Sequence, residues 1–372
     1  MAPQKPGAGE ALTSSPAPGG RQVWRRLLAR RAALAATLVI VLLALVAAAA
    51  PLLSALEGQD PTSYHNDLLD SAAGGVPTGS FGGVSADHWL GVEPGTGRDV
   101  FARLVHGARI SLLVAVGATL VQVTLGVLIG LAAGLGNRLV DQLIGNTTEV
   151  MLALPSLVFA ISLMAVVPPG FPRPLLLTLV IGLLGWAGTS RVVRAQTLSL
   201  RQLDYVSAAR LAGASRWRIA RRELLPSLAA PVITYAAVLL PSNIIAEAGL
   251  SFLGVGVKPP TSSWGQMLSG ATTWFRADPM YVLLPSALLF VTVLAFTVLG
   301  DAVRTELDPR AASRLRVGTA RGTAKDATAG TTADATAGQA ATADGTAGQA
   351  AAGDSAAKGT ASEQTTAEEA TA

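Results

Sequence analysis

The chain has 372 residues, of which half are hydrophobic and 14% are charged, and its formal net charge is +4. This charge does not indicate nucleic-acid binding, because the basic residues are concentrated beside long apolar runs. The sequence has no cysteine, which excludes disulfides and thiolate metal sites within it.

Charge-free apolar runs dominate the sequence. A single run of this kind could be a buried helix of a soluble core. Six of them in one chain predict an all-α integral membrane protein with six transmembrane helices, because lipid offers no partner to unpaired backbone groups. Each run is near the ~20 residues that cross a bilayer core, and the runs cover residues 32–56, 110–137, 150–172, 174–190, 224–246 and 279–300.

Residues 1–31 are predicted to be a cytoplasmic N-terminal tail, and residues 32–56 the first transmembrane helix. The tail is rich in Pro, Gly and Ala up to residue 20 and carries six basic residues against one acid. A basic region before an apolar run is also typical of a signal peptide. The apolar run exceeds the usual core of about 7–15 residues, so a retained span is favoured.

Residues 57–108 are predicted to be an extracytoplasmic loop, since their Gly, Ser and Asp content is typical of loops. Seven acids and three arginines lie in residues 57–109, whereas eight arginines and two acids lie in residues 191–223. The excess of positive charge on cytoplasmic loops therefore places both termini and the 191–223 loop in the cytoplasm.

The three histidines, His65, His88 and His106, do not have metal-ligand spacing. His88 is predicted to be a solvated loop residue, and no metal or cofactor is predicted. No Gly-x4-Gly-Lys-Ser/Thr loop is found in the sequence, so the chain is not expected to hydrolyse ATP in the P-loop manner.

Residues 109–310 are predicted to hold the other five transmembrane helices and the loop 191–226. Glycines recur in the second apolar run with a small-xxx-small spacing, which favours close helix packing: Gly117, Gly126, Gly130 and Gly134. Glu247 is the one acid at the edge of an apolar run. It either lines a pathway, as intramembrane acids often do, or faces the outer water.

The segment Ser207–Pro226 reads as a basic, amphipathic helix–Gly–helix. Gly213 can adopt the positive φ that ends a helix, and Pro226 can open the fifth span without losing a hydrogen bond. Trp217, Ala220 and Leu224 are spaced as a narrow apolar stripe. An interfacial helix on anionic lipid and a helix that docks on a protein both fit this pattern.

Residues 311–372 are predicted to be a disordered, low-complexity tail. The segments 332–341 and 342–351 match at nine of ten positions. The tail has hardly any aliphatic residue larger than alanine, so burial cannot offset the entropy of ordering it.

The segment Ser207–Pro226 resembles the cytoplasmic "EAA" loop of binding-protein-dependent ABC importer permeases. Ala208, Ala209, Gly213, Leu225 and Pro226 keep the expected spacing, and Ser207 stands where the family has glutamate. Other blocks between residues 25 and 310 resemble the second permease subunit of dipeptide and oligopeptide importers: HWLG at 88–91, GRDVFARLVHGARISL at 97–112, LALPSLVFA at 152–160, YVSAARLAGAS at 205–215, LSFLGVGVKPPTSSWGQML at 250–268 and LGDAVRTELDPR at 299–310.

This resemblance implies a type I importer permease fold in the plasma membrane and a chain that is not itself an enzyme. The partners it implies are a second permease, two cytoplasmic ATPase subunits and an extracytoplasmic solute-binding protein. It also implies a coupling helix that docks on an ATPase, with these residues: Ser207, Ala208, Ala209, Gly213, Ala214, Trp217, Leu225 and Pro226. The implied cargo is a dipeptide or oligopeptide. A nickel or glutathione importer of the same family, or a self-contained secondary transporter, remains an alternative.

Overall fold

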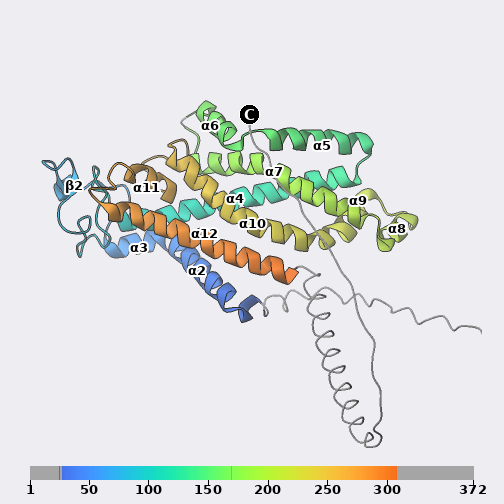
Figure 1. Cartoon of the computed structure of the whole chain (residues 1–372), viewed down its shortest axis with the longest axis horizontal. Helices are drawn as coiled ribbons and strands as arrows, with labels where there is room; N and C mark the ends of the chain where they lie inside the picture. The colour runs from blue at the N-terminus through green and yellow to red at the C-terminus, as the bar shows by residue number, and fades with distance from the viewer. Residues whose placement is uncertain (1–24, 26, 169, 308–372) are drawn as a thin grey trace, which may run out of the picture. The chain divides into compact units, whose positions relative to one another are not determined.

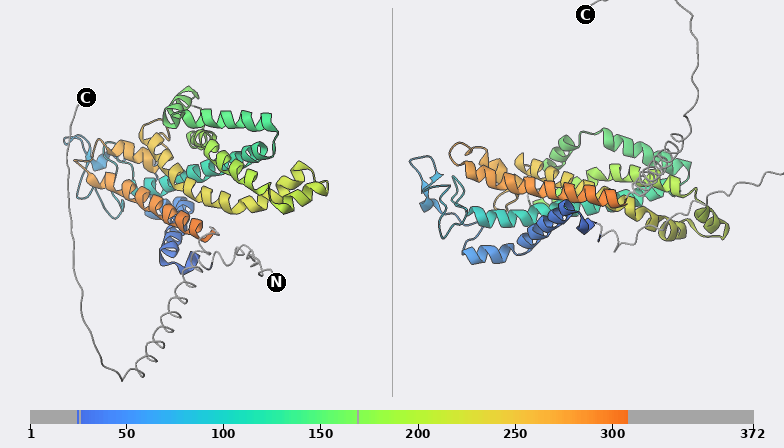
Figure 2. Two further views of the ribbon diagram at one scale, coloured as in Figure 1. Left: turned by 45° about the vertical axis from the view of Figure 1, so that its right-hand side comes forward. Right: turned by 60° about the horizontal axis from the view of Figure 1, so that its bottom comes forward.

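The computed structural model describes residue 25, residues 27–168 and residues 170–307. The chain divides after Ala312, and the described residues all belong to the first unit. Most of the predicted N-terminal tail and the whole predicted disordered tail lie outside them. Long helices run between a looped segment at one end and the helices α8 and α9 at the other (Figures 1 and 2).

Five helices of the described residues are long and apolar enough to cross a membrane: α2 (Arg31–Ala48), α4 (Val100–Leu135), α7 (Arg173–Leu200), α10 (Leu225–Phe252) with the short turns before it (Arg216–Phe252 in all), and α12 (Pro279–Leu307). A sixth span is present if α5 (Arg138–Ala153) and α6 (Ser156–Val166), which are bent by 89° at their junction, count as one. The predicted all-α membrane architecture is confirmed.

The helix bounds differ from the apolar runs where proline or charge intervenes. The third run, at 150–172, contains the bend between α5 and α6, where Pro155 has no N–H to continue a helix. Pro51 stands at the same kind of break between α2 and α3 (Ala50–Glu57). The second span begins at Val100, well before the run at 110–137, because Asp99 caps it by accepting a hydrogen bond from Ala102 N at 2.7 Å.

Glycines of α4 allow α7 to pack unusually close, as the sequence pattern predicted. A Cβ on Gly130 would lie 2.7 Å from the Ser190 carbonyl oxygen, and one on Gly134 would lie 2.6 Å from Thr197 Cβ. Around this seam, buried apolar side chains of α4, α6, α7 and α10 form one core cluster. Side chains of α2, α4, α11 (Trp264–Ala271) and α12 form a second.

The segment between Glu57 and Asp99 is mostly loop, with η1 (Asn66–Leu68) and a short antiparallel pair of β1 (Leu69–Asp70) and β2 (Val76–Pro77). The prediction that His88 is solvated is wrong, since the residue is only 5% exposed. Its Nδ1 lies 2.8 Å from Asp99 Oδ2. The carboxylate that caps α4 therefore also holds this histidine inside the loop segment.

Candidate functional site

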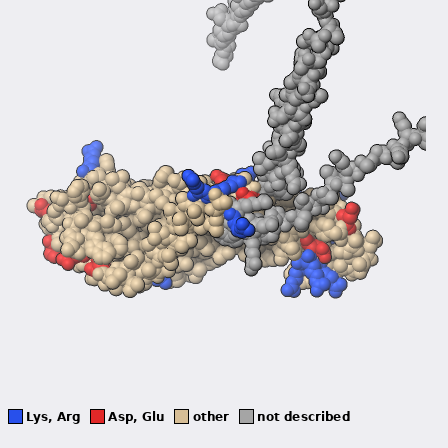
Figure 3. Space-filling model, turned by 90° about the horizontal axis from the view of Figure 1, so that it is seen from below, with Lys and Arg blue, Asp and Glu red and all other residues tan. Residues whose placement is uncertain are grey.

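The loop between α7 and α10 is the part of the chain that the sequence singled out. It folds as α8 (Asp204–Leu211), a turn at Gly213, α9 (Arg216–Ile219) and a π-helical turn, η2 (Ala220–Leu224), that runs directly into α10. Pro226 lies in the first turn of α10, as predicted. Basic side chains gather at this end of the described chain, and acidic ones are prominent at the opposite end (Figure 3).

Gly213 makes the bend of the loop. Its φ is +78°, as predicted, and a Cβ there would meet nothing within 4 Å. The turn closes by two hydrogen bonds, from Gly213 N to Arg210 O and from Ala214 N to Ala209 O, both at 3.0 Å. The backbone conformation, rather than lack of space, therefore requires glycine at this position.

A buried cluster fixes the loop to the membrane helices. Val206 of α8, Ile219 of α9 and Leu224 of η2 pack with Val193 of α7 and Leu228 of α10. Ala209 and Ala214 are half-buried against this cluster. The loop is thus a packed extension of α7 and α10.

The outer face of the loop is exposed. Trp217 is 71% exposed and Leu211 is 91% exposed. Of the other residues that the resemblance assigns to docking, Ala209 and Ala214 are half-buried and five are exposed as well: Ser207, Ala208, Gly213, Leu225 and Pro226. Large apolar side chains in water on a basic surface are typical of an interaction site.

The predicted stripe of Trp217, Ala220 and Leu224 is not a common face. Ala220 and Leu224 are buried, whereas Trp217 points outward. The wide turn of η2 is the physical reason, because Leu225 N bonds to Ala220 O with an i to i+5 spacing. Ile219, five residues before Leu224, takes the buried position instead.

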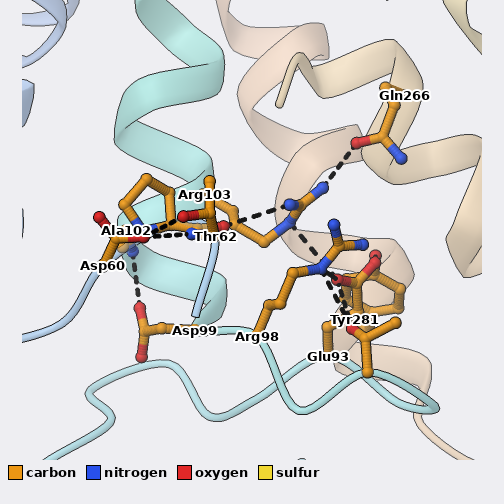
Figure 4. Close-up of polar contacts among 11 residues, drawn as sticks. Asp60, Thr62, Glu93, Arg98, Asp99, Ala102, Arg103, Gln266 and Tyr281 are labelled. Atoms are coloured by element: carbon orange, nitrogen blue, oxygen red, sulfur yellow. Dashed lines mark hydrogen bonds and ion pairs between the residues drawn. The ribbon is translucent and has the colours of Figure 1, made fainter. Parts of the chain in front are cut away.

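At the opposite end, Glu93 is the centre of a buried ionic network (Figure 4). Arg98 Nε donates to Glu93 Oε2 at 2.7 Å, and the Tyr281 hydroxyl donates to Glu93 Oε1. Arg103 Nε lies 3.5 Å from Glu93 Oε2, and its Nη2 donates to Gln266 Oε1 at 2.6 Å. The network therefore ties the 58–99 segment to α4, α11 and α12.

The surroundings of Glu93 and of Glu57, the last residue of α3, shift the pKa values of these two acids in opposite directions. Burial raises the pKa of Glu93, but Arg103, the Tyr281 hydroxyl and Arg98 together outweigh burial and hold this pKa below its usual range. Burial raises the pKa of Glu57 to about 7, although the hydrogen bond from Trp89 N opposes the shift. Asp99 adds to the rise by repulsion.

A second polar group lies among the membrane helices. Asn243 Nδ2 of α10 donates to Thr119 Oγ1 of α4 at 2.8 Å. Gln122 Nε2 of α4 donates to Ile181 O of α7 at 3.0 Å and to Asn243 Oδ1 at 3.1 Å. These amides join α4, α7 and α10. Sequence reasoning missed them, although an amide inside an apolar run was the available signal.

Glu247 is also placed in the interior. It is 0% exposed, and its Oε1 accepts a hydrogen bond from Ser251 Oγ at 2.8 Å. In the part of the chain that the structure describes, no group of three or more His, Cys, Asp or Glu side chains is placed to hold a metal ion.

This geometry defines a polytopic α-helical membrane protein with an exposed, basic loop between two spans. Residues 126–313 match the family described as binding-protein-dependent transport system inner membrane component. Residues 20–70 match the N-terminal transmembrane domain of oligopeptide transport permease C. The chain belongs to this family of inner membrane transport components.

Curated relatives agree over most of their length. A glutathione transport system permease protein of Pectobacterium atrosepticum is 35% identical over 290 residues, 78% of this chain and 91% of that protein. A di/tripeptide transport system permease protein of Pseudomonas aeruginosa is 36% identical over 251 residues, 68% and 80% of the two chains. A dipeptide transport system permease protein of Bacillus subtilis is 38% identical over 229 residues, 61% and 70%.

Among solved structures, the inward-facing MetNI methionine ABC transporter matches 55% of this chain and 96% of its own, with a TM-score of 0.44 and 16% identity. Family membership makes this chain a membrane-spanning permease subunit of an ABC importer. It is a transport subunit and not an enzyme, and the family implies ATPase and binding-protein partners. A self-contained secondary transporter is thereby excluded.

Proposed function

We propose that this permease carries dipeptides or oligopeptides and forms the pathway together with a second permease subunit. The names of the relatives support this cargo, since two of them are dipeptide or di/tripeptide permeases. Glutathione is the second candidate, because the relative aligned over 290 residues is a glutathione permease. Glutathione is itself a tripeptide, so either cargo would need a pathway that accepts a short peptide.

The proposed orientation has both termini and the 191–226 loop in the cytoplasm and the 57–108 segment outside the cell. Eight arginines in residues 191–223 support this orientation. Two ATPase subunits would bind at the loop, and a solute-binding protein would deliver cargo at the other end. The spans would lie in the plasma membrane between the two.

In this proposal the loop couples ATP binding to movement of the spans. Its exposed residues, with Trp217 and Leu211 foremost, would seat in the ATPase, and the Gly213 bend sets the angle between α8 and α9. The buried cluster around Leu224 then passes movement of the ATPase to α7 and α10. The direction of the change follows from tighter binding of ATP to one of the two states.

One observation carries the proposal: in a chain of this permease family, the loop exposes large apolar side chains, Leu211 and Trp217, and packs on the two spans α7 and α10. The test is uptake by the complete complex in proteoliposomes, with the solute-binding protein supplied on the outer side. Labelled dipeptide, a tetrapeptide, glutathione and nickel ion are compared at equal concentration. We expect ATP-dependent uptake of the peptides. Uptake of nickel alone would refute the proposed cargo, while uptake without ATP would refute the proposed coupling.

A further inference from the structure

Glu247 is a carboxyl group enclosed by protein near the C-terminal end of the span α10. The side chain is 0% exposed. None of the ion pairs found among residues 27–168 and 170–307 includes it. A charged carboxylate buried in a membrane-spanning helix is costly unless a cation compensates it.

The groups that surround this carboxyl are hydroxyls. Ser251 Oγ donates to Glu247 Oε1 at 2.8 Å, and the hydroxyls of Ser111 and Ser263 lie beside the side chain. Glu247 Oε2 has no hydrogen-bond partner within the described chain. Ser111 and Ser263 each already accept a backbone N–H, from Trp264 and Gln266 respectively. Each of these oxygens still has a lone pair that could accept a hydrogen bond from the O–H of a neutral carboxyl.

Ser251 connects the carboxyl to the turn that follows α10. Its hydroxyl hydrogen is committed to Glu247, and its oxygen accepts the N–H of Val257 at 3.1 Å. The turn lies tight against this serine, since a Cβ on Gly256 would be 2.7 Å from Ser251 Cα. Beyond the turn, α11 packs back on α10 so closely that a Cβ on Gly265 would be 2.6 Å from Ala248 Cα.

We propose that Glu247 is an uncharged positioning residue: its protonated carboxyl fixes Ser251, and through it the 253–257 turn, so that α11 stays attached to the outer part of α10. The residue therefore holds the packing of the span rather than a transported solute. Arg103 of α4 donates a hydrogen bond to Gln266 of α11 and so secures α11 to α4 as well.

The test uses the complete transporter complex and a cysteine reporter, since the natural sequence has no cysteine. Val257 is buried, so Val257→Cys is expected to react slowly with a small membrane-permeant maleimide. Four variants are compared in this background. Glu247→Gln keeps size and hydrogen bonding without charge, Glu247→Ala removes the group, and Ser251→Ala breaks the connection. Ile244→Ala, one turn earlier on α10 and equally buried, is the matched control for lost volume.

In the Glu247→Gln variant we expect the rate of maleimide labelling to stay within about twofold of the parent, which carries Val257→Cys alone. In the Glu247→Ala and Ser251→Ala variants we expect labelling about tenfold faster or more, because the turn loses a buried hydrogen-bond partner. Ile244→Ala should label like the parent. Labelling is measured without cargo, so it does not depend on the proposed function. A second readout, which rests on that function, is ATP-dependent peptide uptake, kept by Glu247→Gln and reduced by Glu247→Ala.

Three results would overturn the assignment. Fast labelling of Glu247→Gln would mean that the carboxyl is charged. Slow labelling of Glu247→Ala would mean that it positions nothing, and fast labelling of Ile244→Ala would mean that any cavity in α10 releases the turn. Loss of peptide uptake in the parent complex, with the labelling pattern intact, would instead refute the proposed cargo alone.

Discussion

Replacing Gly213 by alanine changes one property of the loop between α7 and α10, its backbone conformation. The residue has a φ of +78°, and the added Cβ would meet nothing within 4 Å. Steric conflict with neighbours therefore contributes nothing to the expected cost. What remains is the cost of a left-handed conformation for an ordinary residue, about 1–2 kcal/mol. That cost corresponds to a roughly 5- to 30-fold smaller population of the bent loop relative to alternative conformations.

The assay compares Gly213→Ala, Gly213→Asp and Gly249→Ala in the reconstituted complex. Gly249 is the matched control, because a Cβ there also meets nothing within 4 Å but the residue lies within α10 with no positive φ. Alanine should be harmless at Gly249, since it is favoured over glycine inside a helix by roughly 0.5–1 kcal/mol. All three variants should insert in the membrane at parental levels.

We expect Gly213→Ala to lower uptake and cargo-stimulated ATP hydrolysis together by up to about 30-fold, since the conformational cost sets the upper bound. Gly213→Asp should abolish both, because a charge is added to the docking surface as well. Parental uptake by Gly213→Asp, with hydrolysis still coupled, would show that the loop is only an interfacial helix. Equal loss in Gly249→Ala would show that the defect is general.

Topology, the tail and pH give further tests. Ser80→Cys should be labelled from outside by an impermeant maleimide and Ser215→Cys only after the membrane is opened; outside labelling of position 215 would reverse the orientation. Truncation after Arg310 should leave uptake and co-purification with the ATPases intact, because the removed tail has hardly any large aliphatic residue; lost co-purification would contradict this. Because the pKa of Glu57 is raised from 4.5 to about 7, its contribution to stability is present below pH 4.5 and is lost as the pH rises through about 7. Glu57→Gln should flatten the dependence of the thermal unfolding midpoint on pH over this window, and an unchanged slope would contradict the assignment.

The predictable part of the fold rests on local physics. Apolar runs marked the spans, Gly213 marked a positive φ, and the small residues of the second run marked the seam between α4 and α7. Each of these signals depends on a residue and its near neighbours in the chain. The charge-free run starts at residue 110, whereas α4 starts at Val100. Absence of charge marks only the part of a helix that can lie in lipid, while the start of the helix is set by a capping residue such as Asp99.

The unpredictable part rests on contacts between distant residues. Glu93 meets Tyr281 across 188 positions, and Arg103 meets Gln266 across 163. No local sequence pattern indicates such pairs, so residues 57–108 were predicted to be a loop and His88 was predicted to be solvated. A buried charge is tolerated only when the fold places a partner of opposite charge or a hydrogen-bonding group beside it. The sequence alone does not show which distant residues become such partners.

The distribution of these contacts along α10 bears on how the spans move. Before Pro231 the helix is anchored through Leu228 to the loop between α7 and α10. After Pro241 it is anchored through Asn243 and Glu247 to α4 and to the turn before α11. The two prolines lie inside the helix, where each removes a backbone hydrogen bond and favours a kink. Bending of α10 is therefore easiest between its two anchored ends. Movement that enters at the loop would tilt the first part of the helix, while the outer part stays fixed to α4 and α11 as one unit.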